Sequence, residues 1–234
     1  MNAIFKREFL AYFRTPLGYV IVSAMYFFTG YYFSTYNIFR NTTDTSGMFS
    51  MLFSVVLFIV PVLTMRLLSE ERRVKTDQTL FTSPVSRFGI VLSKYLAALS
   101  VFVVAVSGTL VAAMVLQLHS QPDWPVIFGN FIGLILLGAA LIAICLFISS
   151  LTESQVIAAI SGFGVSLFLV LLDALHFLVT NSALRMRLRH MSFRGRYSGF
   201  TIGVVGFSDV CFFISIAVCF LLLTVIVLER RRWQ

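Results

Sequence analysis

The sequence predicts an all-α integral membrane protein with six membrane-spanning helices. Of its 234 residues, 59% are hydrophobic and only 12% are charged, whereas charge occupies about a quarter of a typical soluble domain. Six stretches are apolar over the roughly 20 residues that a helix needs to cross a bilayer. A soluble fold of this length could not hide so much apolar surface, so that surface must face lipid. The net charge of +8 is therefore a poor indication of nucleic-acid binding.

The predicted spans form one transmembrane domain that occupies the whole chain. The first span follows a basic segment but is too long for a signal peptide and lacks a small-residue cleavage site, so we expect it to be retained. The three cysteines, Cys145, Cys211 and Cys219, lie within apolar runs. This placement favours buried thiols over disulfides or a metal site. The spans lie near 17–37, 48–68, 90–116, 125–150, 156–180 and 208–228.

The basic residues predict that both termini lie in the cytoplasm. Lys and Arg are enriched in cytoplasmic loops, and an even number of spans puts the two termini on one side. That side would hold twelve basic residues, and the other side six. The segment 181–207 nevertheless carries five arginines that would face outward, against the usual bias. The twelve basic residues on the predicted cytoplasmic side are Lys6, Arg7, Arg14, Arg66, Arg72, Arg73, Lys75, Arg87, Lys94, Arg230, Arg231 and Arg232.

Residues 1–16 predict an amphipathic helix that lies in the membrane interface. Aromatic side chains fall on one helical face and most of the cations on the other. The apolar face would sit at the headgroup boundary, and Pro16 would separate this helix from the first span. The segment could equally be a simple anchor. The aromatic face holds Phe5, Phe9, Tyr12 and Phe13, and the cations are Lys6, Arg7 and Arg14.

The connection 69–89, between the second and third spans, is too long and too patterned for a simple turn. Mixed charges precede an apolar pair, Leu80 and Phe81, and Pro84 follows. This pattern suggests a short amphipathic helix that docks into a partner's cleft, although a solvated charged loop would also explain it. The charged candidates for the docking contact are Glu70, Glu71, Arg72, Arg73 and Arg87.

The segment 181–207 predicts an interfacial or re-entrant structure on the outer side. Arg185, Arg189 and Arg196 cluster on one helical face, opposite apolar residues. Because guanidinium groups bind phosphate and carboxylate in a bidentate way, these arginines could contact outer-leaflet lipid headgroups or an acidic substrate. Alternatively, they could snorkel to the interface without a specific ligand.

The fifth predicted span contains Asp173 and, three residues later, His176. This spacing puts both on one helical face, where they could form a polar pair. Ionisable residues at membrane depth suggest function, and an intramembrane enzyme or proton-linked carrier would use such a pair. The chain lacks the further motifs that hydrolysis needs, so a packing role is the main hypothesis. Gly129 and Gly133 form one G-x-x-x-G pair, which permits close helix approach.

Four ordered blocks resemble the permeases of ABC-2 transporters. They are FKREFLAYFRTPLGYV, RLLSEERRVKTDQTLFTSPVSRFGIVLSKYLA, SSLTESQVIAA and GFSDVCFFISIAVCFLLLTVIVLERRRW. Together they cover much of the chain, and they are similar to the branch that includes the gliding-motility (GldF-like) and copper-maturation (NosY-like) permeases. The resemblance implies a bacterial inner-membrane protein that pairs with a second permease copy or a paralogue to give twelve helices.

The resemblance also implies two cytoplasmic ATPase subunits. The segment from Glu70 to Arg87 would be the coupling helix at the ATPase interface, and residues 2–16 the connecting helix. The chain has three lysines and none follows a glycine, so it lacks the phosphate-binding loop G-x-x-x-x-G-K-[ST]. We therefore expect no cofactor in this chain, with ATP and Mg²⁺ bound by the partner.

Two functional classes remain open at this stage. One is the permease of an exporter, in which hydrolysis by the separate ATPase moves a substrate. The other is a membrane-embedded mechanical or assembly component that moves periplasmic or membrane accessory proteins without solute transport. Both need the same dimer and the same ATPase contact, so the sequence does not separate them.

The orientation can be tested at Ser182. In a background without the native cysteines, Ser182→Cys should react with a membrane-impermeant maleimide on intact cells, because the basic-residue bias places 181–207 outside. Labelling that occurs only after permeabilisation would show that the orientation is inverted.

Overall fold

The structure, a computed structural model, describes residues 2–74, 87–118, 121–178 and 192–230, and within these residues it consists of helices and short connections. The helices are α1 (Asn2–Arg14), α2 (Pro16–Phe33), the π-helix η1 (Ser34–Ile38), α3 (Ser46–Thr64), α4 (Ser69–Val74), α6 (Arg87–Val106), α7 (Gly108–Gln117), α8 (Trp124–Leu151), α9 (Gln155–Leu178), α11 (Phe193–Thr201) and α12 (Phe207–Arg230).

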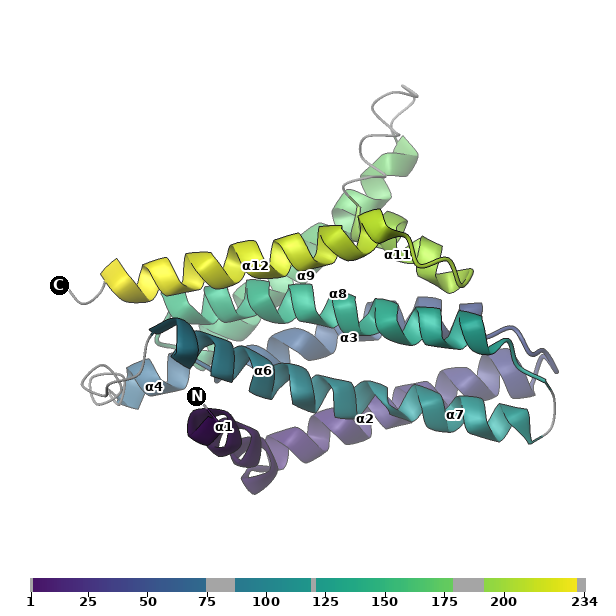
Figure 1. Cartoon of the computed structure of the whole chain (residues 1–234), viewed down its shortest axis with the longest axis horizontal. Coiled ribbons are helices and arrows are strands. Elements are labelled where there is room, and N and C mark those ends of the chain that lie inside the picture. Colours follow the sequence, from purple (N-terminus) through teal and green to yellow (C-terminus); the bar gives the residue numbers. More distant parts are fainter. Residues whose placement is uncertain (1, 75–86, 119–120, 179–191, 231–234) are drawn as a thin grey trace.

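The long helices run side by side along the long axis of the molecule (Figure 1). We call the end where α3 finishes, α6 begins and α4 lies the α4 end, and the opposite end the α7 end. Helix α8 is the centre of the bundle, because it contacts α3, α6, α9, α11 and α12. Its sequence is apolar on all sides, as expected of a helix that is surrounded by others.

Among the described residues, five stretches are long and apolar enough to cross a membrane: Ser46–Thr64, Phe88–Gln117, Trp124–Leu151, Gln155–Ala174 and Phe207–Arg230. They correspond to the second to sixth predicted spans. Helix α2, in the position of the first, falls outside this set because its four tyrosines lower its mean hydropathy. It continues into η1 without a break and packs against α3, α6 and α7.

The predicted break at Pro16 is present, since Thr15 is the N-cap of α2 and Pro16 is its first residue. A side chain at Gly18 would place its Cβ only 2.6 Å from the Tyr12 carbonyl oxygen, so glycine permits the tight return of α2 past α1. On α1 the aromatic side chains of the predicted apolar face are partly or fully buried. Those of Lys6, Arg7 and Arg14 are exposed.

The predicted third span is two helices rather than one, with the break at Ser107. The Tyr26 hydroxyl of α2 lies 3.0 Å from the Ser107 hydroxyl and donates to the Val104 carbonyl at 3.3 Å. The Tyr26 ring also occupies the space beside Gly108, where a Cβ would lie 2.8 Å from it. A side chain on another helix therefore occupies the break.

Within the described part of the segment 181–207, α11 packs against α8, α9 and α12. The G-x-x-x-G pair of α8 makes this contact. A Cβ at Gly133 would lie 2.8 Å from the Phe200 ring, and one at Gly129 would lie 3.3 Å from the Gly203 Cα. The close approach that the motif permits thus brings a short helix, rather than a second spanning helix, onto α8.

All three cysteines are free. Cys145 is buried in α8, but Cys211 and Cys219 are exposed on α12. Other helices of the chain therefore do not cover these two thiols, and their place in the lipid stays a prediction. They lie on an apolar helix with one side packed on α8 and the other side uncovered within the single chain.

Substitution at Gly138 tests the packing of the central helix. The Cβ of Gly138→Ala would lie 2.1 Å from the ring of Phe102, which is fully buried, so we expect a loss of about 1–3 kcal/mol from overpacking. The matched control is Gly164→Ala, whose Cβ would meet nothing within 4 Å and should leave the stability unchanged or raised. Thermal unfolding in detergent measures both. Equal midpoints would contradict the contact between α6 and α8.

Candidate functional site

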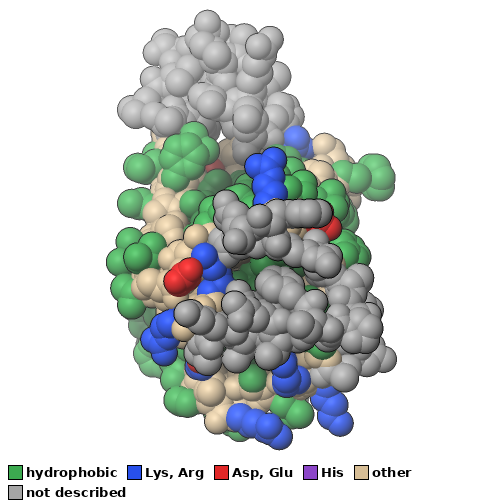
Figure 2. Space-filling model, turned by 90° about the vertical axis from the view of Figure 1, so that its left-hand side faces the viewer, with side chains coloured by type: hydrophobic (Ala, Val, Ile, Leu, Met, Phe, Trp, Pro, Cys, Tyr) green, Lys and Arg blue, Asp and Glu red, His purple; other side chains and the backbone are tan. Residues whose placement is uncertain are grey.

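Charged and hydroxyl side chains from four helices, α1, α4, α6 and α8, and from the two turns after α3 and α8 converge at the α4 end. We call this group the α4-end cluster; it consists of Glu8, Tyr12, Arg66, Glu70, Arg72, Lys94, Ser149 and Glu153. Figure 2 looks onto this end and shows blue Lys and Arg side chains among the green apolar ones. The cluster lies next to the connection between α4 and α6, which contains the predicted docking helix.

The most buried charge in the cluster is Lys94, on the first turns of α6, whose side chain is only 1% exposed. Its Nζ donates a hydrogen bond to the Leu67 carbonyl at 2.9 Å and lies 3.4 Å from a carboxylate oxygen of Glu8. A buried ammonium group is tolerated only when such partners replace water. Lys94 therefore joins α6 to the end of α3 and to α1.

Tyr12 makes a second connection between α1 and α3. Its hydroxyl donates to the Leu63 carbonyl at 2.9 Å, and the ring is buried. Burial raises the pKa of Tyr12 far above its ordinary value, with the Glu8 charge acting in the same direction, so the hydroxyl keeps its proton. Because Leu63 lies in the last turn of α3, this bond also satisfies a backbone carbonyl at a helix end.

Arg66 and Glu70 form a bidentate ion pair directly after α3, with N–O distances of 2.7 and 3.0 Å. The hydrogen bond from Arg66 holds the pKa of Glu70 below its usual value, and the pKa of Arg66 is raised by the same bond. The pair fixes the turn between α3 and α4 in one conformation.

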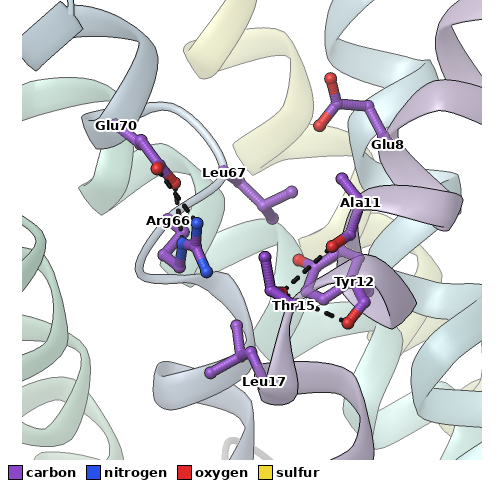
Figure 3. A pocket seen from close by; sticks show the side chains of 8 residues that line it. All are labelled: Glu8, Ala11, Tyr12, Thr15, Leu17, Arg66, Leu67 and Glu70. Atoms are coloured by element: carbon purple, nitrogen blue, oxygen red, sulfur yellow. Dashed lines mark hydrogen bonds and ion pairs between the residues drawn. The ribbon is translucent and has the colours of Figure 1, made fainter.

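A small pocket of about 80 Å³ lies between α1 and this turn. Figure 3 shows Arg66 and Glu70 on one side of it and Glu8, Tyr12 and Thr15 on the other. The carboxylates and the guanidinium at its edge are only partly buried. The pocket therefore gives the α4 end a small hollow, mainly apolar inside and with charged side chains at its edge, that the sequence alone did not indicate.

Helix α8 holds the start of α4. The Ser149 hydroxyl accepts hydrogen bonds from the backbone N–H groups of Leu68 and Ser69, at 3.3 and 3.2 Å. Arg72 of α4 donates to the Ser150 carbonyl at 3.3 Å and to Glu153 at 3.0 Å. Amides at a helix start have no partner inside the helix, so these bonds attach α4 to the turn between α8 and α9.

At the α7 end, Asp173 accepts a hydrogen bond from Ser192, which is the N-cap of α11 and accepts from the Gly195 N–H at 2.9 Å. Arg196 of α11 forms an ion pair with Asp209 at 2.8 Å and lies over the Phe212 ring at 5.1 Å. The polar residues predicted for this region thus hold α11 against α9 and α12. Arg196, proposed above as an anion contact, has these partners within the chain.

Several predicted site residues lie outside the described part of the chain. They are Leu80, Phe81, Arg185 and Arg189, together with the side chains of Glu71, Arg87 and His176. The Asp173–His176 pair therefore stays a prediction. Within the described residues, no group of three His, Cys, Asp or Glu side chains is placed to hold a metal ion.

Sequence reasoning did not single out Glu8 or Ser149, and it treated Lys94 only as a basic residue on the cytoplasmic side. One signal was present for Lys94, which lies inside the predicted span 90–116. A lysine within an apolar run needs a partner. The sequence does not show that the partner is Glu8, 86 residues earlier.

The comparison with known families agrees with this architecture. The family described as "ABC-2 family transporter protein" matches residues 5–226. The chain belongs to this family. No protein of curated function matches it in sequence. The family is the membrane component of ATP-binding-cassette transporters, so the chain is a multi-pass membrane protein of the permease type, and the family implies partnership with an ATP-binding-cassette ATPase.

Removing the buried charge of the cluster should destabilise this ABC-2 permease. Lys94→Ala removes the ammonium partner of Glu8, whose side chain is 14% exposed and keeps only the exposed Arg7 at 2.7 Å, and breaking such a buried pair typically costs about 3 kcal/mol. The matched control is Lys6→Ala on the exposed side of α1, where we expect a change of about 0.5 kcal/mol or less. Chemical unfolding in detergent measures both variants. A similar small effect at the two positions would show that Lys94 does not hold α1.

Proposed function

We propose that the chain is the permease subunit of an ATP-binding-cassette exporter, which couples ATP hydrolysis by a separate cytoplasmic ATPase to movement of a substrate across or out of the bacterial inner membrane. One observation carries the proposal. The connection between α4 and α6 is flanked by helices that the α4-end cluster ties to α1, α3 and α8.

A force on this connection would reach several helices at once. Arg72 and Ser149 tie α4 to α8, and Lys94 ties α6 to the end of α3 and to α1. An ATPase that binds the connection differently in its two nucleotide states can shift the permease only through such a firm attachment. We infer that α1, the end of α3, α4 and the start of α6 move as one body.

The proposed topology has six spans and both termini in the cytoplasm. Helix α2 and η1 run without a break from Pro16 to Ile38, which is long enough to cross a bilayer. The tyrosines of α2 are tolerated because Tyr26 bonds to α6 and α7, and because tyrosine is common at membrane interfaces.

The functional assembly in this proposal contains two permeases and two ATPase subunits. In the single chain, α9 and α12 leave large apolar side chains uncovered, among them Ile160, Phe168 and Leu222. Lipid and a second permease copy or paralogue would cover these faces. The proposal includes membership of the gliding-motility and copper-maturation branch, which the resemblance of the four sequence blocks supports.

The ATPase contact is best tested at Phe81, in the connection between α4 and α6. Truncating an aromatic anchor at an interface costs on the order of 2 kcal/mol or more, whereas neutralising one rim charge costs about 1 kcal/mol or less. We therefore expect Phe81→Ala to reduce co-purification of the ATPase and to uncouple hydrolysis, and Arg87→Gln to have a milder effect. Binding and ATPase activity are measured in lipid nanodiscs at equal permease expression. Full binding and full stimulation with Phe81→Ala would refute the coupling role of this segment.

A further inference from the structure

The outward side of α1 carries cations with a leucine between them. Lys6, Leu10 and Arg14 follow one another at intervals of four residues, so they lie along one line of the helix, and Arg7 lies beside them. All four side chains are exposed, and we call them the α1 face. Arg7 bonds to Glu8 at 2.7 Å. Lys6 and Arg14 have no ion-pair partner among the described residues, so the α1 face has two positive charges that the bundle does not neutralise.

The aromatic side chains of α1 point the other way, toward the bundle. The rings of Phe5, Phe9 and Phe13 form a row, with centroids 6.1 and 5.2 Å apart. The row continues from Phe13 to Tyr19 of α2 at 5.6 Å. Phe9 and Phe13 pack against the buried core. Because the bundle partly covers these rings, α1 presents its cations, rather than its predicted apolar face, to the surroundings.

Two polar contacts fix the level of α1 along the bundle. The Tyr12 hydroxyl donates to the Leu63 carbonyl in the last turn of α3. Glu8 lies 3.4 Å from Lys94, near the start of α6. Both α3 and α6 belong to stretches that are long and apolar enough to cross a membrane. The α1 helix is therefore level with the ends of two such stretches, which is the depth of the headgroups when these helices span a bilayer.

The arrangement of the helices indicates what covers the α1 face. Helix α1 runs across the long helices, beside the bundle (Figure 1). Helix α4, which leads into the proposed ATPase contact, lies farther out toward the end of the bundle. Blue Lys and Arg side chains gather at the lower edge of Figure 2, on the side where Figure 1 shows α1. This set-back position beside the spans favours the surface of the bilayer over a subunit docked at the end.

We propose that the α1 face binds the headgroups of anionic phospholipids, such as phosphatidylglycerol. Lys6 and Arg14 contact the lipid phosphates, because ammonium and guanidinium groups both pair with phosphate oxygens. Leu10, which is 37% exposed between the two cations, contacts the glycerol and the upper part of the acyl chains. Basic residues at a membrane surface attract anionic lipids in this way. The site goes beyond the proposed function, since it requires neither a transported substrate nor the ATPase.

Two lipids with identical acyl chains test the role of charge. Phosphatidylglycerol carries a net negative charge, whereas the quaternary ammonium of phosphatidylcholine neutralises the same phosphate. Native mass spectrometry of the full chain in detergent, titrated with each lipid, should show phosphatidylglycerol bound about twentyfold more tightly, because each of the two unpaired cations contributes a factor of about five. Equal binding of the two lipids would overturn the proposal.

Two double variants with the same net charge locate the binding. Lys6→Gln with Arg14→Gln removes the unpaired cations of the α1 face. Arg40→Gln with Arg194→Gln removes two other exposed cations, after η1 and on α11. Since all four positions are exposed, both double variants should fold. The preference for phosphatidylglycerol should disappear in the first and persist in the second. Full preference in the first double variant, or loss of preference in both, would refute the site.

A nitroxide label at Leu10 separates the membrane from a protein partner. Leu10→Cys is labelled in a background without the native cysteines and reconstituted, without the ATPase, in vesicles of phosphatidylglycerol and phosphatidylcholine. Power-saturation electron paramagnetic resonance should place the label at headgroup depth, with little access for a water-soluble nickel chelate. Full access for the chelate that is lost only when the ATPase is added would assign the α1 face to the ATPase and refute the lipid site.

Discussion

The burial of the Lys94 ammonium group constrains the whole α4 end of this permease. A charge that is 1% exposed is stable only where partners from other elements are held in place around it. Those partners are a carboxylate of α1 and a carbonyl just after α3. Helices α1, α3 and α6 therefore cannot separate without depriving the Lys94 ammonium of these partners. This dependence makes the end of the bundle next to the α4–α6 connection a rigid unit in the proposed mechanism.

The two ends of the bundle use polar side chains for different purposes. At the α4 end, ion pairs and capping hydrogen bonds tie α4 to α3 and α8. At the α7 end, Ser192 and Arg196 fasten a short helix against α9 and α12, and η1 lines one side of a pocket. The apolar helix α8 lies between them and gives the bundle its common packing surface.

Much of the fold could be predicted because the thickness of the bilayer sets the length and the apolar composition of each span. Each span can therefore be recognised from its own stretch of about 20 residues. The order of the helices, a separate amphipathic helix before the first span and the break at Pro16 followed from such local patterns. The break at Ser107 did not, and the side chain that occupies it, Tyr26, lies 81 residues away in the sequence. The contacts of Lys94 with Glu8 and of Ser149 with Ser69 are equally non-local.

The central claim is that α1 and the start of α6 move together when the ATPase changes state. The direct test is the distance between spin labels at Lys6 and Phe88, both exposed positions on α1 and α6, measured by double electron–electron resonance in the reconstituted complex. The distribution of distances should be narrow and centred at the same distance in the nucleotide-free and vanadate-trapped states. It should broaden when Lys94 is replaced by alanine. A change between the two states that approaches one helical turn, about 5 Å, would contradict the account, because α1 would then move independently of α6.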